Sequence, residues 1–311
     1  MRENSAFHEH GADSDIHDTS HAHEKKHVHS HTHSKGYSHI HEHLHGLENH
    51  HTNWAASALL HVDNVSFSYR STSVLNGINV HVARGEILAI LGPNGVGKST
   101  LLKCMNLILR PKRGAVMLEK VDLSKMSAND IAKHVGYVAQ RAESTRMTVF
   151  DSVLLGRKPH ITWKTTDYDY QLVEETLCKF GLSYMKLRYI DEISGGELQR
   201  VCLCRAIVQK PAVLLLDEPT SSLDLCRQMD ILSTIREVVD LHNVATVMTM
   251  HDLNLALRFA DRFIFMKGGS IFAVCDKSGV TEEIIESVYD IKVDLISHKG
   301  LPLVIPSGNC K

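Results

Sequence analysis

The residues best suited to chemistry form a glycine-rich segment that ends in a lysine and two hydroxyl residues. It fits the pattern G-x-x-x-x-G-K-[ST], in which backbone N–H groups and the start of a helix bind phosphate. The apolar run 87–91 precedes it, and a helical pattern follows from Leu101. We predict a nucleotide site with Lys98 on the β- and γ-phosphates and Ser99 on Mg²⁺. Its predicted nucleotide-binding residues are Gly92, Pro93, Asn94, Gly95, Val96, Gly97, Lys98, Ser99 and Thr100.

Two adjacent carboxylates form a second candidate for chemistry. Asp217 ends the apolar run 212–217, and Glu218 follows it. An acid at the carboxyl end of a parallel strand beside a phosphate loop can hold Mg²⁺. A second acid can orient and deprotonate a water molecule for attack on the γ-phosphate. We therefore expect Asp217 to bind the metal and Glu218 to act as the base.

An alternation of strands and helices must position these residues. We expect strands at 59–69, 74–82, 87–91, 115–118, 136–140, 212–217, 245–250 and 262–266, the first at a sheet edge. We expect helices at 98–109, 129–134, 196–208, 225–240, 253–260 and 281–288. This alternation predicts a mostly parallel sheet covered on both faces. Short helical patterns among polar turns predict a helical insertion at about 141–200.

Composition limits the class of protein. The chain has 311 residues, of which 43% are hydrophobic, and a formal net charge of −2. It can therefore build a sizeable core, and its charge predicts no affinity for nucleic acid. No apolar run approaches the roughly 20 residues of a membrane span. The seven cysteines are scattered without a C-x-x-C motif, which favours a reducing compartment.

The N-terminal segment differs in composition from the rest of the chain. Residues 1–53 hold 15 of the 22 histidines and few apolar residues, so we predict a disordered tail over 1–56. Neutral imidazoles spaced two residues apart can bind Zn²⁺, Ni²⁺ or Co²⁺. There are two alternatives: the tail is solvated and has no specific role, or it responds to pH. The possible metal ligands are His27, His29, His31, His33, His39, His41, His43 and His45.

The order of these motifs resembles that of the ATP-binding cassette (ABC) ATPases over about residues 57–275. The most specific feature is the segment 193–200, ISGGELQR, which resembles the family's signature. A serine and two glycines at a helix N-terminus offer a second phosphate site. The resemblance implies that this site closes on ATP held by another copy. Its residues are Ser194, Gly195, Gly196 and Glu197.

The resemblance also gives roles to residues that are weak signals alone. It implies that Tyr69 stacks on adenine and that Asp224 communicates across a dimer. It implies that Gln140 reaches Mg²⁺ and the attacking water, and that His251 contacts the γ-phosphate. Without the resemblance, these would be a strand-face tyrosine, a helix N-cap and two polar strand ends. The implied catalytic set is Lys98, Gln140, Glu218 and His251, and the implied Mg²⁺ set is Ser99, Gln140 and Asp217.

Two departures from the usual signature point to one group within the family. Ile193 stands where leucine is usual, and Glu197 stands where glutamine is common. Together with the segment 156–160, these variants resemble the importers of iron chelates and cobalamin. The implied fold is a P-loop ABC domain over 57–311, with a mostly parallel core, an antiparallel β subdomain and a small helical subdomain.

The implied function is the ATP-hydrolysing subunit of an importer. Two copies would act as a homodimer at the cytoplasmic face of the membrane, docked on separate permease subunits and served indirectly by a substrate-binding protein. The expected cargo is a metal chelate: an iron–siderophore complex, haem or cobalamin. Free Zn²⁺, Ni²⁺ or Co²⁺ is the first alternative, favoured by the tail. A non-transport ABC ATPase and a metal store or sensor are the others.

Overall fold

The computed structural model describes residues 58–140, 146–221 and 223–308. These residues belong to one compact unit. The predicted tail, 1–56, and its eight candidate metal ligands lie outside the described residues. Within the described ranges, no helix is both long and apolar enough to cross a bilayer.

A six-stranded sheet forms the centre of the domain, in the order β10-β9-β3-β8-β7-β6. All its pairings are parallel except that of β10 with β9. The predicted mostly parallel core is therefore confirmed. The strands are β3 (Ile87–Leu91), β6 (Val135–Val138), β7 (Val213–Asp217), β8 (Ala245–Thr249), β9 (Arg262–Lys267) and β10 (Ser270–Asp276).

Both faces of this sheet are covered, as β3 shows. Ile87, Ala89 and Leu91 pack into one hydrophobic cluster with residues of α6, α7 and α8. Leu88 and Ile90 point the other way, into a cluster formed with α2 and a second sheet. Every residue of β3 is buried, which explains its uninterrupted apolar sequence. The helices are α2 (Lys98–Met105), α6 (Gly195–Ile207), α7 (Leu225–His242) and α8 (Leu253–Phe259).

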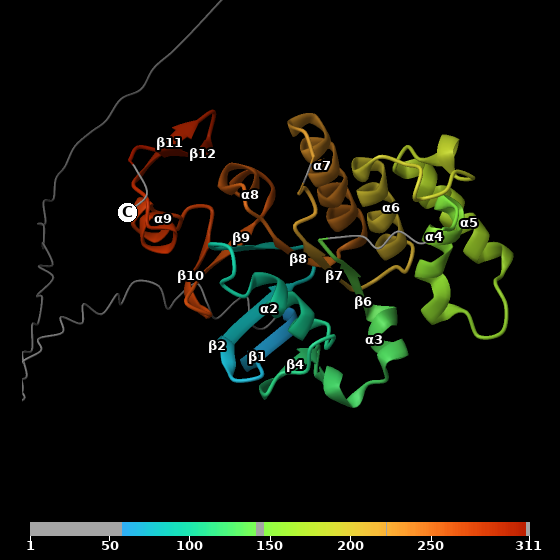
Figure 1. Cartoon of the computed structure of the whole chain (residues 1–311), viewed down its shortest axis with the longest axis horizontal. Helices are drawn as coiled ribbons and strands as arrows, with labels where there is room; N and C mark the ends of the chain where they lie inside the picture. The colour runs from blue at the N-terminus through green and yellow to red at the C-terminus, as the bar shows by residue number, and fades with distance from the viewer. Residues whose placement is uncertain (1–57, 141–145, 222, 309–311) are drawn as a thin grey trace, which may run out of the picture. The chain divides into compact units, whose positions relative to one another are not determined.

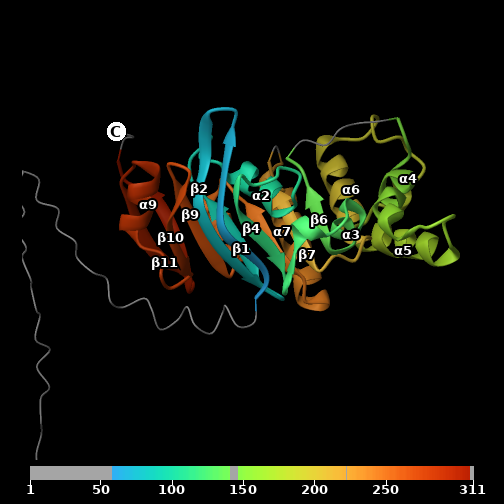
Figure 2. The same ribbon diagram turned by 90° about the horizontal axis from the view of Figure 1, so that it is seen from below.

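The second sheet is antiparallel, in the order β2-β1-β4-β5. Its strands are β1 (Ala58–Tyr69), β2 (Thr72–Ala83), β4 (Arg113–Leu118) and β5 (Val121–Asp122). The prediction of β1 as an edge strand was wrong, because β1 pairs with β2 on one side and with β4 on the other. Figure 2 shows this sheet lying across the central one. Helix α3 (Ala128–His134) then leads into β6.

The predicted helical insertion forms one end of the described domain (Figures 1 and 2). It contains α4 (Val149–Leu154), α5 (Asp167–Lys179) and α6, with 3-10 turns at Leu155–His160 and Ser183–Met185. A buried ion pair joins Arg157 Nε to Asp169 Oδ1 at 2.9 Å. Arg157 also donates to the carbonyl of Val208, just beyond the end of α6. This segment therefore fastens α6, which carries the signature residues, to α5.

The C-terminal elements lie at the opposite end (Figure 1). Helix α9 (Glu282–Tyr289) is followed by the hairpin of β11 (Val293–His298) and β12 (Leu301–Pro306). The helix predicted at 281–288 is thus confirmed.

One predicted helix and one predicted strand extend beyond the observed ends of these elements. The helix expected over 98–109 ends at Met105, and Leu107 adopts φ 51°, which no α-helix accommodates. The strand expected over 136–140 ends at Val138, so Gln140 lies in the loop beyond it.

Candidate nucleotide site

The phosphate-binding loop joins β3 to α2. Gly92 has φ 146° and Gly97 has φ 111°, conformations that favour glycine. A Cβ at Gly92 would lie 2.5 Å from the carbonyl oxygen of Met266, and one at Gly97 would lie 2.9 Å from Leu75 Cδ2. Both glycines are therefore required by the backbone path and by the closeness of their neighbours.

Lys98 is the first residue of α2, and its side chain folds back over the loop. Its Nζ donates to the carbonyls of Gly92 at 2.7 Å and Pro93 at 3.1 Å. Burial lowers the pKa of Lys98, and the carboxylates of Glu218 and Asp217 act in the opposite direction. These two carboxylates thus favour the charged form of a lysine that the loop holds almost fully buried.

Ser99 and Asp217 meet at the carboxyl ends of β3 and β7. Ser99 Oγ donates to Asp217 Oδ1 at 2.9 Å, and Thr249 Oγ1 donates to the same oxygen at 2.8 Å. Thr249, at the end of β8, also accepts the backbone N–H of Glu218 at 2.9 Å. Thr249 was not predicted from the sequence, where its only signal was its place at the end of an apolar strand. It fixes both carboxylate residues relative to the sheet.

Glu218 is contacted from two sides by residues predicted to act with it. Gln140 Nε2 donates to Glu218 Oε2, and His251 Nε2 lies against Glu218 Oε1. Glu218 itself is 8% exposed and has φ 50°, in the left-handed region. For a non-glycine residue this backbone conformation costs about 1–3 kcal/mol, and such strain gathers at functional sites.

An open cleft of about 470 Å³ brings the predicted residues together. Tyr69, 47% exposed, stands at its side as the last residue of β1. The predicted residues that line the cleft are Tyr69, Asn94, Gly95, Gly97, Lys98, Ser99, Thr100, Gln140, Glu218 and His251. Asp217 does not line it and reaches it through Ser99.

The donor set fits Mg²⁺ accompanied by a nucleotide. Mg²⁺ prefers oxygen ligands and is usually held by one or two carboxylates together with substrate phosphates. The hydroxyl of Ser99 and the carboxylate of Asp217 already share a hydrogen bond and could both turn toward one cation. In the described part of the chain, no cluster of three or more His, Cys, Asp or Glu forms a metal cage of its own.

The signature residues lie apart from this cleft, and none of them is among its described lining residues. Ser194 is the N-cap of α6, and it forms a capping box with Glu197. Ser194 Oγ donates to Glu197 Oε2 at 2.7 Å, and Tyr184 Oη donates to Glu197 at 3.1 Å. These hydrogen bonds, those from Ser194 first, lower the pKa of Glu197. The glutamate that departs from the common signature thus stabilises the start of the signature helix.

The glycines of the signature have different surroundings. A Cβ at Gly195 would meet nothing within 4 Å, so the start of α6 is open on that side. A Cβ at Gly196 would lie 3.0 Å from Leu223 Cδ2 and 3.2 Å from Arg227. Asp224 lies between these two residues in sequence and caps α7 by accepting the N–H of Arg227. The Asp224 loop therefore packs on the signature within one chain.

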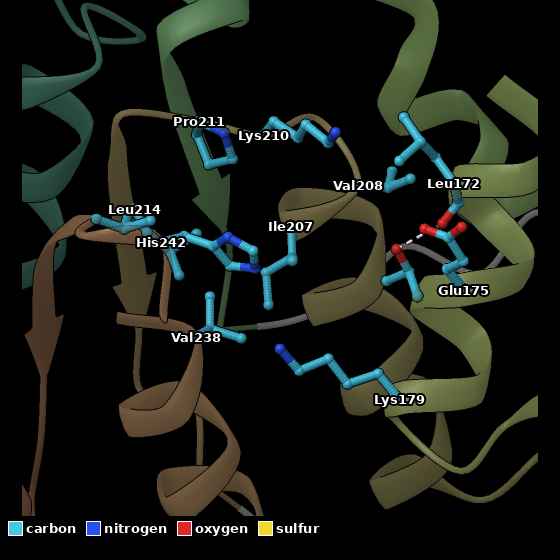
Figure 3. Close-up of a pocket in the computed structure, with 12 residues that line it drawn as sticks. Leu172, Glu175, Lys179, Ile207, Val208, Lys210, Pro211, Leu214, Val238 and His242 are labelled. Carbon is cyan, nitrogen blue, oxygen red and sulfur yellow. Dashed lines mark hydrogen bonds between the residues drawn. The ribbon is translucent and has the colours of Figure 1, made fainter. Parts of the chain in front are cut away.

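A second hollow, of about 420 Å³, lies between α5, α6 and α7. Figure 3 shows Lys179 of α5 and His242 at the end of α7 pointing toward the same apolar space, beside Ile207 and Val238. None of the residues predicted to bind nucleotide lines it. It marks the junction between the helical region and the sheet.

A contact behind the phosphate-binding loop was also not predicted from the sequence. Gly92 donates its N–H to the hydroxyl of Tyr289 over 2.9 Å. The two residues are 197 positions apart, and a tyrosine at the end of a helix gives no local signal of such a contact.

Comparison with known proteins agrees with this geometry. A model of the ABC transporter family matches residues 75–221. An uncharacterized ABC transporter ATP-binding protein of Methanocaldococcus jannaschii is 48% identical over 250 residues, which cover 80% of this chain and 98% of the relative. The hemin import ATP-binding protein of Bradyrhizobium diazoefficiens is 35% identical and is matched over 81% of this chain and 96% of its own.

A solved structure gives the same answer for the fold. It is described as an inward-facing conformation of a putative metal-chelate type ABC transporter. It aligns with a TM-score of 0.70 and 28% identity, over 80% of this chain and 97% of the solved chain. With the phosphate-binding loop, the acidic pair and the signature helix in place, the chain belongs to the ATP-binding proteins of ABC transporters, the subunits that couple ATP hydrolysis to transport.

Proposed function

We propose that the chain powers the uptake of a metal chelate, such as an iron–siderophore complex, haem or cobalamin, through a separate permease. The observation that carries the ATPase part is the single cleft shared by Lys98, Ser99, Gln140, Glu218 and His251. The likeness to a hemin import protein and to a metal-chelate transporter supports the class of cargo.

Each residue of the cleft has a role that its position supports. Backbone N–H groups of the loop and Lys98 hold the phosphates, and the exposed ring of Tyr69 stacks on the adenine. Ser99 and Asp217 would hold Mg²⁺, which would neutralise charge on the phosphates. Glu218, positioned by Thr249, Gln140 and His251, orients and deprotonates the attacking water.

The site needs a second copy of the chain to be complete. The open N-terminus of α6 at Gly195 is a ready phosphate site, but it is not part of the chain's own cleft. We infer a head-to-tail homodimer in which Ser194 and Gly196 of one copy face the ATP of the other. The loop of Asp224, which packs on Gly196 through Leu223, would then transmit closure.

The helical region offers a surface for the permease. Several large hydrophobic side chains are exposed there, and exposed apolar surface can mark an interaction site. They are Leu155, Trp163, Tyr168, Tyr170, Tyr184, Leu187 and Tyr189, with Trp163 97% exposed. Gln140 lines the cleft, contacts Glu218 and precedes this region in the sequence, so docking there could act on Glu218 through Gln140.

Uptake by cells tests the cargo. We would delete the gene, complement it with the wild-type chain or with Glu218→Gln, and compare uptake of labelled cobalamin, haem and a ferric siderophore. We expect uptake of one chelate to be lost and to be restored only by the wild-type chain. Uptake of all three that is unaffected by deletion would refute the chelate proposal.

Free metal ions are the second candidate, favoured by the eight paired histidines of residues 27–45. The same cells are assayed with labelled Zn²⁺, Ni²⁺ and Co²⁺. A full-length variant with those histidines replaced by asparagine separates the two cargoes. If the histidine variant loses ion uptake and keeps chelate uptake, the histidines belong to the transport mechanism. If its ion uptake is normal, the chelate remains the cargo.

A further inference from the structure

The side chain of Tyr289 reaches the phosphate-binding loop from the C-terminal end of the chain. Its hydroxyl oxygen accepts the N–H of Gly92, the first residue of the loop, over 2.9 Å. Gly92 is buried, so the hydroxyl satisfies a donor that is shielded from water. Tyr289 does not line the nucleotide cleft, and it therefore contacts the loop from behind.

The start of the loop is held on a second side by β9. With φ 146°, Gly92 lies so close to this strand that a Cβ would be 2.5 Å from the carbonyl oxygen of Met266. The direction of the chain as it leaves β3 is thus fixed between the backbone of β9 and the hydroxyl of Tyr289. The N–H groups that follow can point at phosphate only if this direction is kept.

Tyr289 is itself anchored to β9. Lys267, the last residue of that strand, places Nζ 3.0 Å from Asp290 Oδ1 and also donates to the carbonyl of Ser287. These two residues flank the end of α9, so the tyrosine between them has little freedom to move away from the loop. Burial raises the pKa of Tyr289 to about 12, so the hydroxyl keeps its proton at neutral pH.

The C-terminal hairpin connects this contact with the helix that follows His251. Glu282 and Glu286 of α9 accept the N–H groups of Leu295 and Val293 at 2.7 and 3.2 Å. At the other strand, the side chain of Asn254 accepts the N–H of Val304 at 2.8 Å.

Asn254 also donates to the carbonyl of Val304, at 3.2 Å. It belongs to α8, which begins two residues after His251. The hairpin therefore joins the helix that holds the loop to the helix that follows the predicted γ-phosphate contact.

We propose that Tyr289 is a positioning residue for the phosphate-binding loop, and that the segment 282–306 braces it there. The proposal rests on the proposed function, because it takes this loop to be where ATP binds. It assigns a role in ATP affinity to a residue that touches neither the nucleotide nor the attacking water. It also explains why the chain continues past the sheet with a helix and a hairpin packed at this place.

The test is Tyr289→Phe in the purified full-length chain, well below its melting temperature. When a buried N–H loses its hydrogen-bond partner, the equilibrium constant that depends on that hydrogen bond changes roughly tenfold. We expect the Kd and the KM for ATP each to rise about tenfold, with kcat nearly unchanged. A role in folding alone would lower the melting temperature and leave the Kd of the folded molecules as it was.

Ser66→Ala is the matched control. It removes a hydroxyl that accepts the N–H of Gly77 at 2.9 Å, in the antiparallel sheet and outside the cleft. We expect its Kd for ATP to equal that of the wild type. If Tyr289→Phe fails to fold, Lys267→Met tests the same anchor from an exposed position, and we expect a severalfold rise in Kd.

The outcomes separate this inference from the proposed function. ATP binding by Tyr289→Phe or Lys267→Met that is as tight as in the wild type would overturn the role of Tyr289 and leave the ATPase in place. A wild-type chain that binds no ATP would overturn both. Amide hydrogen exchange gives a further check, because Gly92 should exchange slowly in the wild type and faster in Tyr289→Phe.

Discussion

Replacement of Glu218 by glutamine tests the assignment of the base most directly. Glutamine keeps the size and shape of the side chain, so the contacts that hold position 218 to Thr249 through its backbone are unchanged. The amide cannot accept a proton from water at neutral pH. Lys98 and Ser99 keep their places in the loop, and we therefore expect ATP binding to persist.

The magnitude follows from the role and the surroundings of the carboxylate. Glu218 is 8% exposed and is contacted by Gln140 and His251, so bulk water has little room to replace it as the base. A positioned base contributes about 10²- to 10⁴-fold to a rate. At about 1.36 kcal/mol per factor of ten, its loss raises the barrier by about 3–5 kcal/mol.

The assay compares steady-state ATPase activity with equilibrium binding of ATP on the same preparation. Glu237→Gln is the control, because Glu237 is an exposed glutamate on α7 outside the cleft. We expect kcat to fall by two to four orders of magnitude in Glu218→Gln and to be unchanged in Glu237→Gln. Turnover by Glu218→Gln near the wild-type rate would show that another group acts as the base.

Three further predictions concern the helical region. Ser194→Arg should abolish turnover while an isolated chain still binds ATP, whereas Ser127→Arg, which removes the comparable N-cap of α3, should leave turnover intact; normal hydrolysis by Ser194→Arg would refute the head-to-tail dimer. Arg157→Met should cost about 3–5 kcal/mol in urea denaturation, because it leaves Asp169 buried without its partner; a loss below about 1 kcal/mol, the value for an exposed pair, would contradict this. Because the pKa of Glu197 is lowered, the capping box stabilises the fold at pH values above the ordinary glutamate pKa of about 4.3. This stabilisation is lost as the pH falls through the lower pKa of the folded state. The loss of stability in acid should therefore be smaller in Glu197→Gln than in the wild type.

Much of the candidate site could be predicted because its residues follow buried strands. The phosphate-binding loop, Gln140, Glu218 and His251 each come shortly after an apolar run. Parallel strands bring their carboxyl ends to one edge of a sheet, which is where the cleft lies. The order β3-β8-β7-β6 itself was not predicted, because periodicity shows that a strand is buried without showing which strand lies beside it.

Other features depend on long-range contacts that leave no local trace. Glu218 adopts its left-handed conformation while its N–H donates to the hydroxyl of Thr249, which lies 31 residues further along the chain. β1 has the partial alternation of an edge strand, yet β4 pairs with its second side. The contact of Tyr289 with Gly92 joins residues that are 197 positions apart, and only the packing of α9 against β9 and its Lys267 anchor bring them together.

A single chain carries two candidate phosphate sites, the cleft and the N-terminus of α6, and these lie apart from each other. The cleft holds the residues proposed to act on the phosphates and the water. The open N-terminus of α6 lies on the helical region, where Arg157 and the capping box of Ser194 hold it. A rigid attachment of α6 to α5 has a clear advantage if the helical region also carries the permease. Movement of the exposed apolar surface would then move the signature as a unit. In that arrangement, hydrolysis depends on the position of the membrane partner, and the permease can be driven by the closing of two ATP sites.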